Sequence, residues 1–100
     1  MILFEWDEAK ADKNLRKHGI SFELARQVFL DPCALVEQER IEDGELRWWT
    51  IGLVGGMVVL FVAHTTEEQG QHEIVRIISA RRATRKERIR YDENRKKYVG

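Results

Sequence analysis

The sequence has few of the residues that mark disulfide-rich or metal-binding proteins. Its single cysteine, Cys33, cannot form an intramolecular disulfide and indicates no cysteine-ligated metal site. Because no histidine lies near it in sequence, we interpret Cys33 as an inert, half-buried thiol beside Pro32. The three histidines have neither HxH nor HExxH spacing, so we expect no metal and no cofactor.

Long hydrophobic runs are also scarce, and only the stretch 48–66 approaches the length of a membrane span without an Asp, Glu, Lys or Arg. Its middle holds Gly55 and Gly56 between two runs of β-branched and aromatic residues, which is a tight-hairpin signal. Two central glycines would also weaken a helix. Glu5 and Asp7 come too early for the apolar core of a signal peptide, so we expect a cytoplasmic protein.

The charges of the chain are unevenly distributed. The formal net charge is zero over 100 residues, a length that predicts one domain. Residues 1–73 hold seven lysines and arginines against fourteen aspartates and glutamates, whereas residues 74–100 hold ten against three. This split predicts that the basic C-terminal part contacts a polyanion, an acidic partner or the acidic N-terminal part. A solvated, charged helix is the alternative.

Hydrophobic periodicity and turn signals predict an α+β fold. Helices are expected after the capping residues Asp7 and Ser21, and a third after Thr84. The expected strands are 2–6, 34–38, 46–54, 57–65 and 72–80, with polar loops at 39–45 and 67–71. The pattern is two N-terminal helices, an antiparallel sheet with 2–6 at its edge, and a C-terminal helix.

The junction between the last strand and the last helix concentrates arginines. Thr84 and Glu87 form a capping-box pattern, which predicts that the helix starts at Arg85. Arg81 and Arg82 lie in the corner just before it. Guanidinium groups beside free helix N–H groups suit a phosphate, because the dipole, the donors and the fixed charge act together.

Four segments of the chain carry a resemblance to a known family. They are FEWDEAKADKNLRKHGISFELA, RWWTIG, HTT and RIISARRATRKERIRY. In this order they resemble the BrnT family of toxins from bacterial type II toxin-antitoxin pairs. The resemblance implies a RelE-like fold, metal-independent ribonuclease activity, and neutralisation by a small BrnA antitoxin, a DNA-binding ribbon-helix-helix protein. The family's recurring motifs fall on Lys17-His18-Gly19, His64-Thr65, Arg76, Ser79, Arg81, Arg82 and 87–91, whereas the tryptophan pair and the loop 67–72 depart from the family pattern.

Metal-free RNA cleavage needs a proton acceptor, a proton donor and cations around the phosphate that the 2′-hydroxyl attacks. Arg76, Arg81 and Arg82 are the predicted cations; Arg76 alternates with isoleucines on an apolar face, where a charge needs a carboxylate or a ligand. His64 is the predicted proton-transfer residue, supported by His18 or Glu87. Each of these residues has a structural alternative. His64 is then a hydrogen-bonded histidine at a strand end, His18 stabilises the helix dipole at a helix C-terminus, and Glu87 serves only the capping box.

Further RNA contacts are predicted from the basic helix ends. They are Lys17, Arg85, Arg88 and Tyr91, where Tyr91 either stacks on a base or packs against the sheet. We therefore predict an endoribonuclease toxin that acts on RNA and binds a BrnA-like antitoxin. The alternative is a non-catalytic basic module that binds RNA or an acidic protein.

Overall fold

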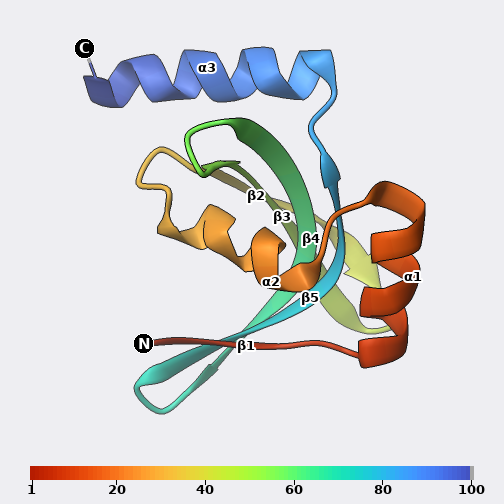
Figure 1. Cartoon of the computed structure of the whole chain (residues 1–100). Helices are drawn as coiled ribbons and strands as arrows, with labels where there is room; N and C mark the ends of the chain where they lie inside the picture. Colours follow the sequence, from red (N-terminus) through yellow and green to blue (C-terminus); the bar gives the residue numbers. More distant parts are fainter. Residues whose placement is uncertain (100) are drawn as a thin grey trace.

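The computed structural model describes residues 1–99 of the chain, in which the helices pack around one sheet (Figure 1). The elements in order are β1 (Ile2–Glu5), α1 (Glu8–His18), α2 (Phe22–Ala25), the 3-10 helix η1 (Arg26–Leu30), β2 (Leu35–Glu42), β3 (Glu45–Val54), β4 (Val58–Gln69), β5 (His72–Arg82) and α3 (Arg85–Val99). The predicted α+β class is confirmed. Among the described residues, no helix is both long and apolar enough to cross a membrane.

The five strands form a single sheet in the order β1-β5-β4-β3-β2. Four of them pair antiparallel, whereas β1 pairs parallel with β5. The sheet is therefore mixed, and the prediction of an antiparallel sheet is wrong at this edge. Parallel pairing follows because β1 is joined to the rest of the sheet through a long crossover rather than a hairpin. The predicted edge position of β1 is confirmed.

Tight turns extend the strands into segments that the sequence predicts as polar loops. Asp43 and Gly44 both have positive φ, 53° and 77°, and join β2 directly to β3. An Asp-Gly pair is the residue choice that such a turn requires, so the loop predicted at 39–45 is wrong. Gly70, with φ 62°, does the same between β4 and β5. The hairpin predicted at Gly55-Gly56 is confirmed.

The N-terminal helices begin where their capping residues predict. Asp7 accepts hydrogen bonds from the backbone N–H groups of Ala9 and Lys10 at 2.8 and 3.2 Å, and α1 ends at Gly19 with φ 71°. The second predicted helix keeps its Ser21 cap but is α-helical for one turn only and continues as η1. There Val28 lies so close to β3 that a Cβ at Gly52 would be 3.0 Å from its atoms.

The two faces of the sheet are covered differently. α1, α2 and η1 pack on one face, and buried Phe22, Val28 and Leu60 are part of that core. On the other face α3 lies across one end only, as Figure 1 shows, above a smaller core with buried Ile51 and Tyr91.

Tyr91 anchors α3 to the rest of the protein. Its hydroxyl donates a hydrogen bond to Oδ2 of Asp31 at 2.5 Å, and the same oxygen accepts from the Leu53 backbone N–H at 2.8 Å. Burial, reinforced by the Asp31 carboxylate, raises the pKa of Tyr91. The phenol therefore stays protonated, and α3 remains attached through it.

Candidate functional site

The second sheet face, which α3 covers only in part, carries Arg47, Trp49, Arg76, Ser79 and Arg81, which we call the arginine face. All five are half-buried. Their common orientation follows from register, because Trp49 pairs with Ala63, Ala63 pairs with Ser79, and side chains alternate along each strand. Contacts agree with this placement, since the Trp49 and Phe61 rings are 5.5 Å apart and Arg81 lies 4.2 Å above the Phe61 ring.

A β-bulge brings Arg76 and Arg81 to the same face. Ala63 pairs with Ser79, but the next residue of β4, His64, pairs with Ile77, so Ile78 is an extra residue in β5. The two arginines are an odd number of positions apart, which would place them on opposite faces of a regular strand. The extra residue shifts the alternation of side chains by one position, so that Arg76 and Arg81 project from the same face.

Arg76 already has a carboxylate partner. Its Nη2 lies 2.6 Å from Oε1 of Glu45, and the two side chains are 40% and 44% exposed. This satisfies the first of the two conditions that the sequence sets for a charge at this position. At such exposure water screens the ion pair, which stabilises the fold by about 1 kcal/mol or less.

Arg81 and Glu87 form a bidentate pair that joins β5 to the start of α3. Two nitrogens of Arg81 lie 2.8 and 3.0 Å from the two carboxylate oxygens. The predicted capping box is confirmed, since Glu87 also accepts from the Thr84 backbone N–H at 2.8 Å. The hydrogen bonds from Arg81 hold the pKa of Glu87 below its usual range, so this carboxylate is ionised at neutral pH.

The predicted phosphate site of Arg76, Arg81 and Arg82 is not formed, because the Arg82 side chain projects from the opposite face of β5. It pairs with Leu60, a residue of the core under the N-terminal helices. Together with Arg88 and Asp92 it lines a hollow of about 460 Å³ beside the β3–β4 turn. Arg85 is exposed at the first position of α3.

His64 is also remote from the arginine face. Its ring lies in the core side of the sheet, 2% exposed, against Phe29 at a centroid distance of 5.0 Å. Nε2 is 2.8 Å from Oγ1 of Thr50, and Nδ1 contacts the backbone oxygen of Thr65 at 3.3 Å. Burial lowers the pKa of His64 to about 4, so it is neutral at neutral pH. The sheet separates it from Arg76 and Arg81, which contradicts the predicted assembly of these three residues in one site.

His18 and Lys17, by contrast, lie beside the arginine face. They line a shallow hollow of about 170 Å³, which we call the α1 pocket. Its other lining residues are Lys10, Lys13 and Asn14 of α1 with Ile78 and Ser79 of β5. Ser79 belongs to both sites, so the α1 pocket and the arginine face are contiguous across the edge of β5.

Tyr91 adopts the packed alternative of the sequence prediction. The ring is 2% exposed and contacts the small core that includes Ile51 and Cys33. A ring in this position is not available to stack on a base, so the predicted RNA contact at Tyr91 is wrong for this conformation. Cys33 is buried, more fully than the half-buried position that the sequence predicts.

Several residues of the site escaped the sequence prediction, among them Arg47, Trp49 and Asn14. Arg47 and Trp49 lie two apart in β3 and so share the arginine face, a signal that strand alternation contained. The Nε of Arg47 is buried and has no hydrogen-bond partner among the described residues. Asn14, buried under the α1 pocket, bonds to the backbone of Ala80, and no local pattern marks that contact.

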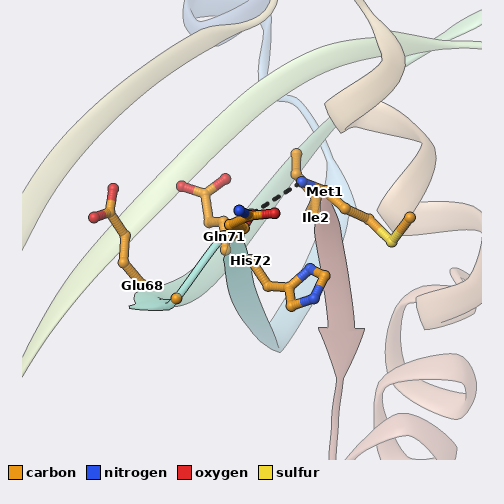
Figure 2. A pocket seen from close by; sticks show the side chains of 7 residues that line it. Met1, Ile2, Glu68, Gln71 and His72 are labelled. Carbon is orange, nitrogen blue, oxygen red and sulfur yellow. Dashed lines mark hydrogen bonds between the residues drawn. The ribbon is translucent and has the colours of Figure 1, made fainter.

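The hollow between the start of β1 and the β4–β5 turn carries two carboxylates beside the N-terminal amino group. Met1, Glu68, Glu73 and His72 are among its lining residues, and its volume is about 280 Å³ (Figure 2). The amino group of Met1 donates to the backbone oxygen of Gln71 at 3.4 Å there (Figure 2). Its carboxylates disfavour an anionic ligand, and the sequence assigns no role to His72.

The fold and the site define a small α+β protein with a mixed five-stranded sheet and a basic, partly open sheet face. The family model described as "Ribonuclease toxin, BrnT, of type II toxin-antitoxin system" matches residues 6–87. The chain therefore belongs to the BrnT family of ribonuclease toxins, which confirms the resemblance in the sequence. It is similar to the crystal structure of the Brucella abortus ribonuclease toxin BrnT, at 27% identity and a TM-score of 0.58, over 85% of this chain and 99% of that one. A comparison with curated proteins found no match.

Proposed function

We propose that this BrnT family member is a metal-independent endoribonuclease whose substrate lies on the arginine face. The observation that carries the proposal is the bulge at Ile78, which sets Arg76 and Arg81 on one face beside Trp49. Two guanidinium groups and an aromatic ring match the phosphates and the bases of single-stranded RNA. Arg47, two residues before Trp49 on β3, adds a third guanidinium to the same face.

The reaction is an internal transesterification. The 2′-hydroxyl oxygen bonds to the adjacent phosphorus while the bond from phosphorus to the 5′-oxygen breaks. A base takes the proton of the 2′-hydroxyl, and the leaving oxygen receives a proton. The products end in a 2′,3′-cyclic phosphate and a 5′-hydroxyl. Arg76 and Arg81 stabilise the charge on the other phosphate oxygens.

We assign proton transfer to His18 in place of His64. His18 is exposed and lines the α1 pocket together with Ser79. An imidazole has one nitrogen that can accept a proton and one that can donate it, as this role requires. Glu87 is a poor donor, because its hydrogen bonds to Arg81 keep it ionised.

Glu45 and Glu87 occupy positions that phosphate oxygens would take. The Arg76 to Glu45 pair is only half-buried and is screened by water, so its replacement by a phosphodiester costs about 1 kcal/mol or less. Substrate binding is thus an exchange of partners at Arg76 and Arg81. This exchange predicts that RNA affinity falls as salt rises.

Cleavage of RNA would inhibit translation, and a BrnA-like ribbon-helix-helix antitoxin would neutralise the toxin. α3 supports such a partner, because two of its apolar side chains, Ile89 and Tyr98, are 47% and 64% exposed. Exposed apolar side chains on a highly charged helix suit a protein that packs against that helix.

The test uses purified protein with RNA in the presence of EDTA, and identifies the product ends. We expect 2′,3′-cyclic phosphate ends, and we expect Arg76→Gln to lower kcat/KM by roughly 100-fold. Arg82→Gln is the matched control, since it removes the same charge from the opposite face of β5. Binding without turnover, with equal reductions in affinity for both variants, would instead establish the alternative, a non-catalytic basic module.

A further inference from the structure

We propose that the α1 pocket is a second phosphate subsite, which holds the RNA backbone next to the nucleotide on the arginine face. This inference rests on the proposed function for the identity of the ligand as RNA. It assigns a binding role to Lys10 and Lys13, two residues to which the sequence prediction gives none.

The lining of the α1 pocket is one-sided in charge. Lys10, Lys13, Lys17 and His18 contribute cationic or titratable groups, and none of the described residues that line it carries a carboxylate. The hollows beside the β3–β4 turn, at the β1 end and under Pro32 each include at least one carboxylate. The α1 pocket therefore favours an anion where these others do not.

Stabilisation of the α1 helix does not explain why Lys10 and Lys13 occupy its first two turns. Lys17 and His18 are in the last turn of α1, where the helix dipole favours cations. Lys10 and Lys13 are outside that turn. Lys13 and Lys17 are four apart on the helix, a spacing at which like charges repel and destabilise it.

No ion pair offsets this repulsion in the part of the chain that the structure describes. Carboxylates approach within 4.0 Å of Arg40, Arg76, Arg81 and Arg90 there, but not of Lys10, Lys13 or Lys17. These four arginines thus have protein partners, whereas the three lysines of α1 are available to a ligand. A phosphodiester backbone supplies the missing negative charge without needing a particular base.

The geometry connects the two sites. Lys10 and Lys17 are about 10 Å apart along the helix axis, enough for more than one phosphate to bind. The pocket opens against Ser79, which lies between Arg76 and Arg81 on β5. A single strand of RNA that occupies the arginine face therefore continues over the edge of β5 and along α1.

The experiment measures binding of a long single-stranded 2′-O-methyl RNA, which cannot be cleaved because its 2′-hydroxyl is blocked. Fluorescence anisotropy over a series of salt concentrations gives the slope of log affinity against log salt. For the double variant Lys10→Gln/Lys13→Gln we expect several-fold weaker binding and a slope reduced by about 0.7 for each phosphate that the variant no longer neutralises. Lys96→Gln/Lys97→Gln is the control, since it removes two exposed charges from α3.

Equal reductions in affinity for the two double variants would overturn the subsite, because net charge alone would then account for the binding. Unchanged RNA binding together with weaker binding of an acidic antitoxin would also overturn it, in favour of a protein partner. Lys10→Arg/Lys13→Arg should restore affinity and slope. Since the RNA cannot be cleaved, this result does not depend on whether the protein is a nuclease, and the cleavage test above is judged separately.

Discussion

The side-chain amide of Asn14 pairs with both backbone groups of Ala80, 66 residues further along the chain. Its Nδ2 donates to the Ala80 oxygen at 2.9 Å and its Oδ1 accepts from the Ala80 N–H at 3.1 Å. Nδ2 also donates to the backbone oxygen of Ile20 at 2.9 Å. The amide thus takes the place of a neighbouring strand along the half of β5 that β1 does not reach. It fixes α1, and with it His18, against the bulged strand.

Substitution of Asn14 should therefore destabilise the protein strongly. Asn14→Leu has nearly the same volume but leaves three buried backbone groups unsatisfied, so we expect the free energy of unfolding to fall by about 3 kcal/mol. Urea denaturation monitored by tryptophan fluorescence measures this decrease. The control Asn94→Leu removes only one hydrogen bond, to the Cys33 oxygen, and should cost about 1 kcal/mol. Equal decreases in the two variants would contradict the claim that the three hydrogen bonds of Asn14 stabilise the fold more than the one of Asn94.

The two adjacent tryptophans should differ in their effect on RNA binding. Trp49 lies on the arginine face, whereas Trp48 lines an apolar hollow on the opposite side with Phe29 and His64. We expect Trp49→Leu to weaken binding of single-stranded RNA roughly tenfold, through the loss of one stacked base. Trp48→Leu should leave the affinity unchanged. A larger effect for Trp48→Leu, with both variants folded by circular dichroism, would place RNA on the other face.

The two histidines should separate catalysis from packing. His18→Gln should lower kcat by roughly 100-fold while RNA affinity stays nearly constant, because a proton-transfer group acts in the transition state. His64→Gln should retain kcat within a few fold at pH 7.5, about one unit above the ordinary histidine pKa. The check is single-turnover cleavage of one labelled RNA by both variants. A decrease of kcat in His64→Gln alone would return the proton-transfer role to the buried histidine.

Burial of His64 should also make the protein acid-sensitive. Its pKa is about 4 in the folded state against 6.5 for a solvated histidine, so the unfolded chain binds the proton more readily. The stabilisation is complete above pH 6.5 and is lost as the pH falls toward 4, in total about 3 kcal/mol. Urea denaturation at several pH values should show this decrease, and His64→Gln should flatten it.

His72 provides the control for this measurement, because it is exposed at the first position of β5. His72→Gln should leave the pH dependence of the unfolding free energy as it is. If the unfolding free energy of His64→Gln still falls by the same amount at acid pH, carboxylates rather than this imidazole cause the decrease.

Local signals predicted the elements well and the sheet less well. The caps at Asp7, Ser21 and Thr84 set helix starts correctly, because each acts within three residues of itself. The parallel pairing of β1 with β5 joins residues that are far apart in the chain, such as Ile2 and Glu73, which no local pattern contains. The Asp43-Gly44 turn was within reach of sequence reasoning, since Asp-Gly is a known hairpin signal.

The composition of the site came from the sequence, and its arrangement did not. The motifs of the BrnT family and the excess of arginine near the C-terminus follow from residue identity alone. Which arginines share a face depends on one extra residue, Ile78, and a shift of one position reverses every side chain beyond it. Only the folded sheet therefore decided that Arg76 and Arg81 share a face, that Arg82 projects from the opposite face, and that His64 is enclosed in the core.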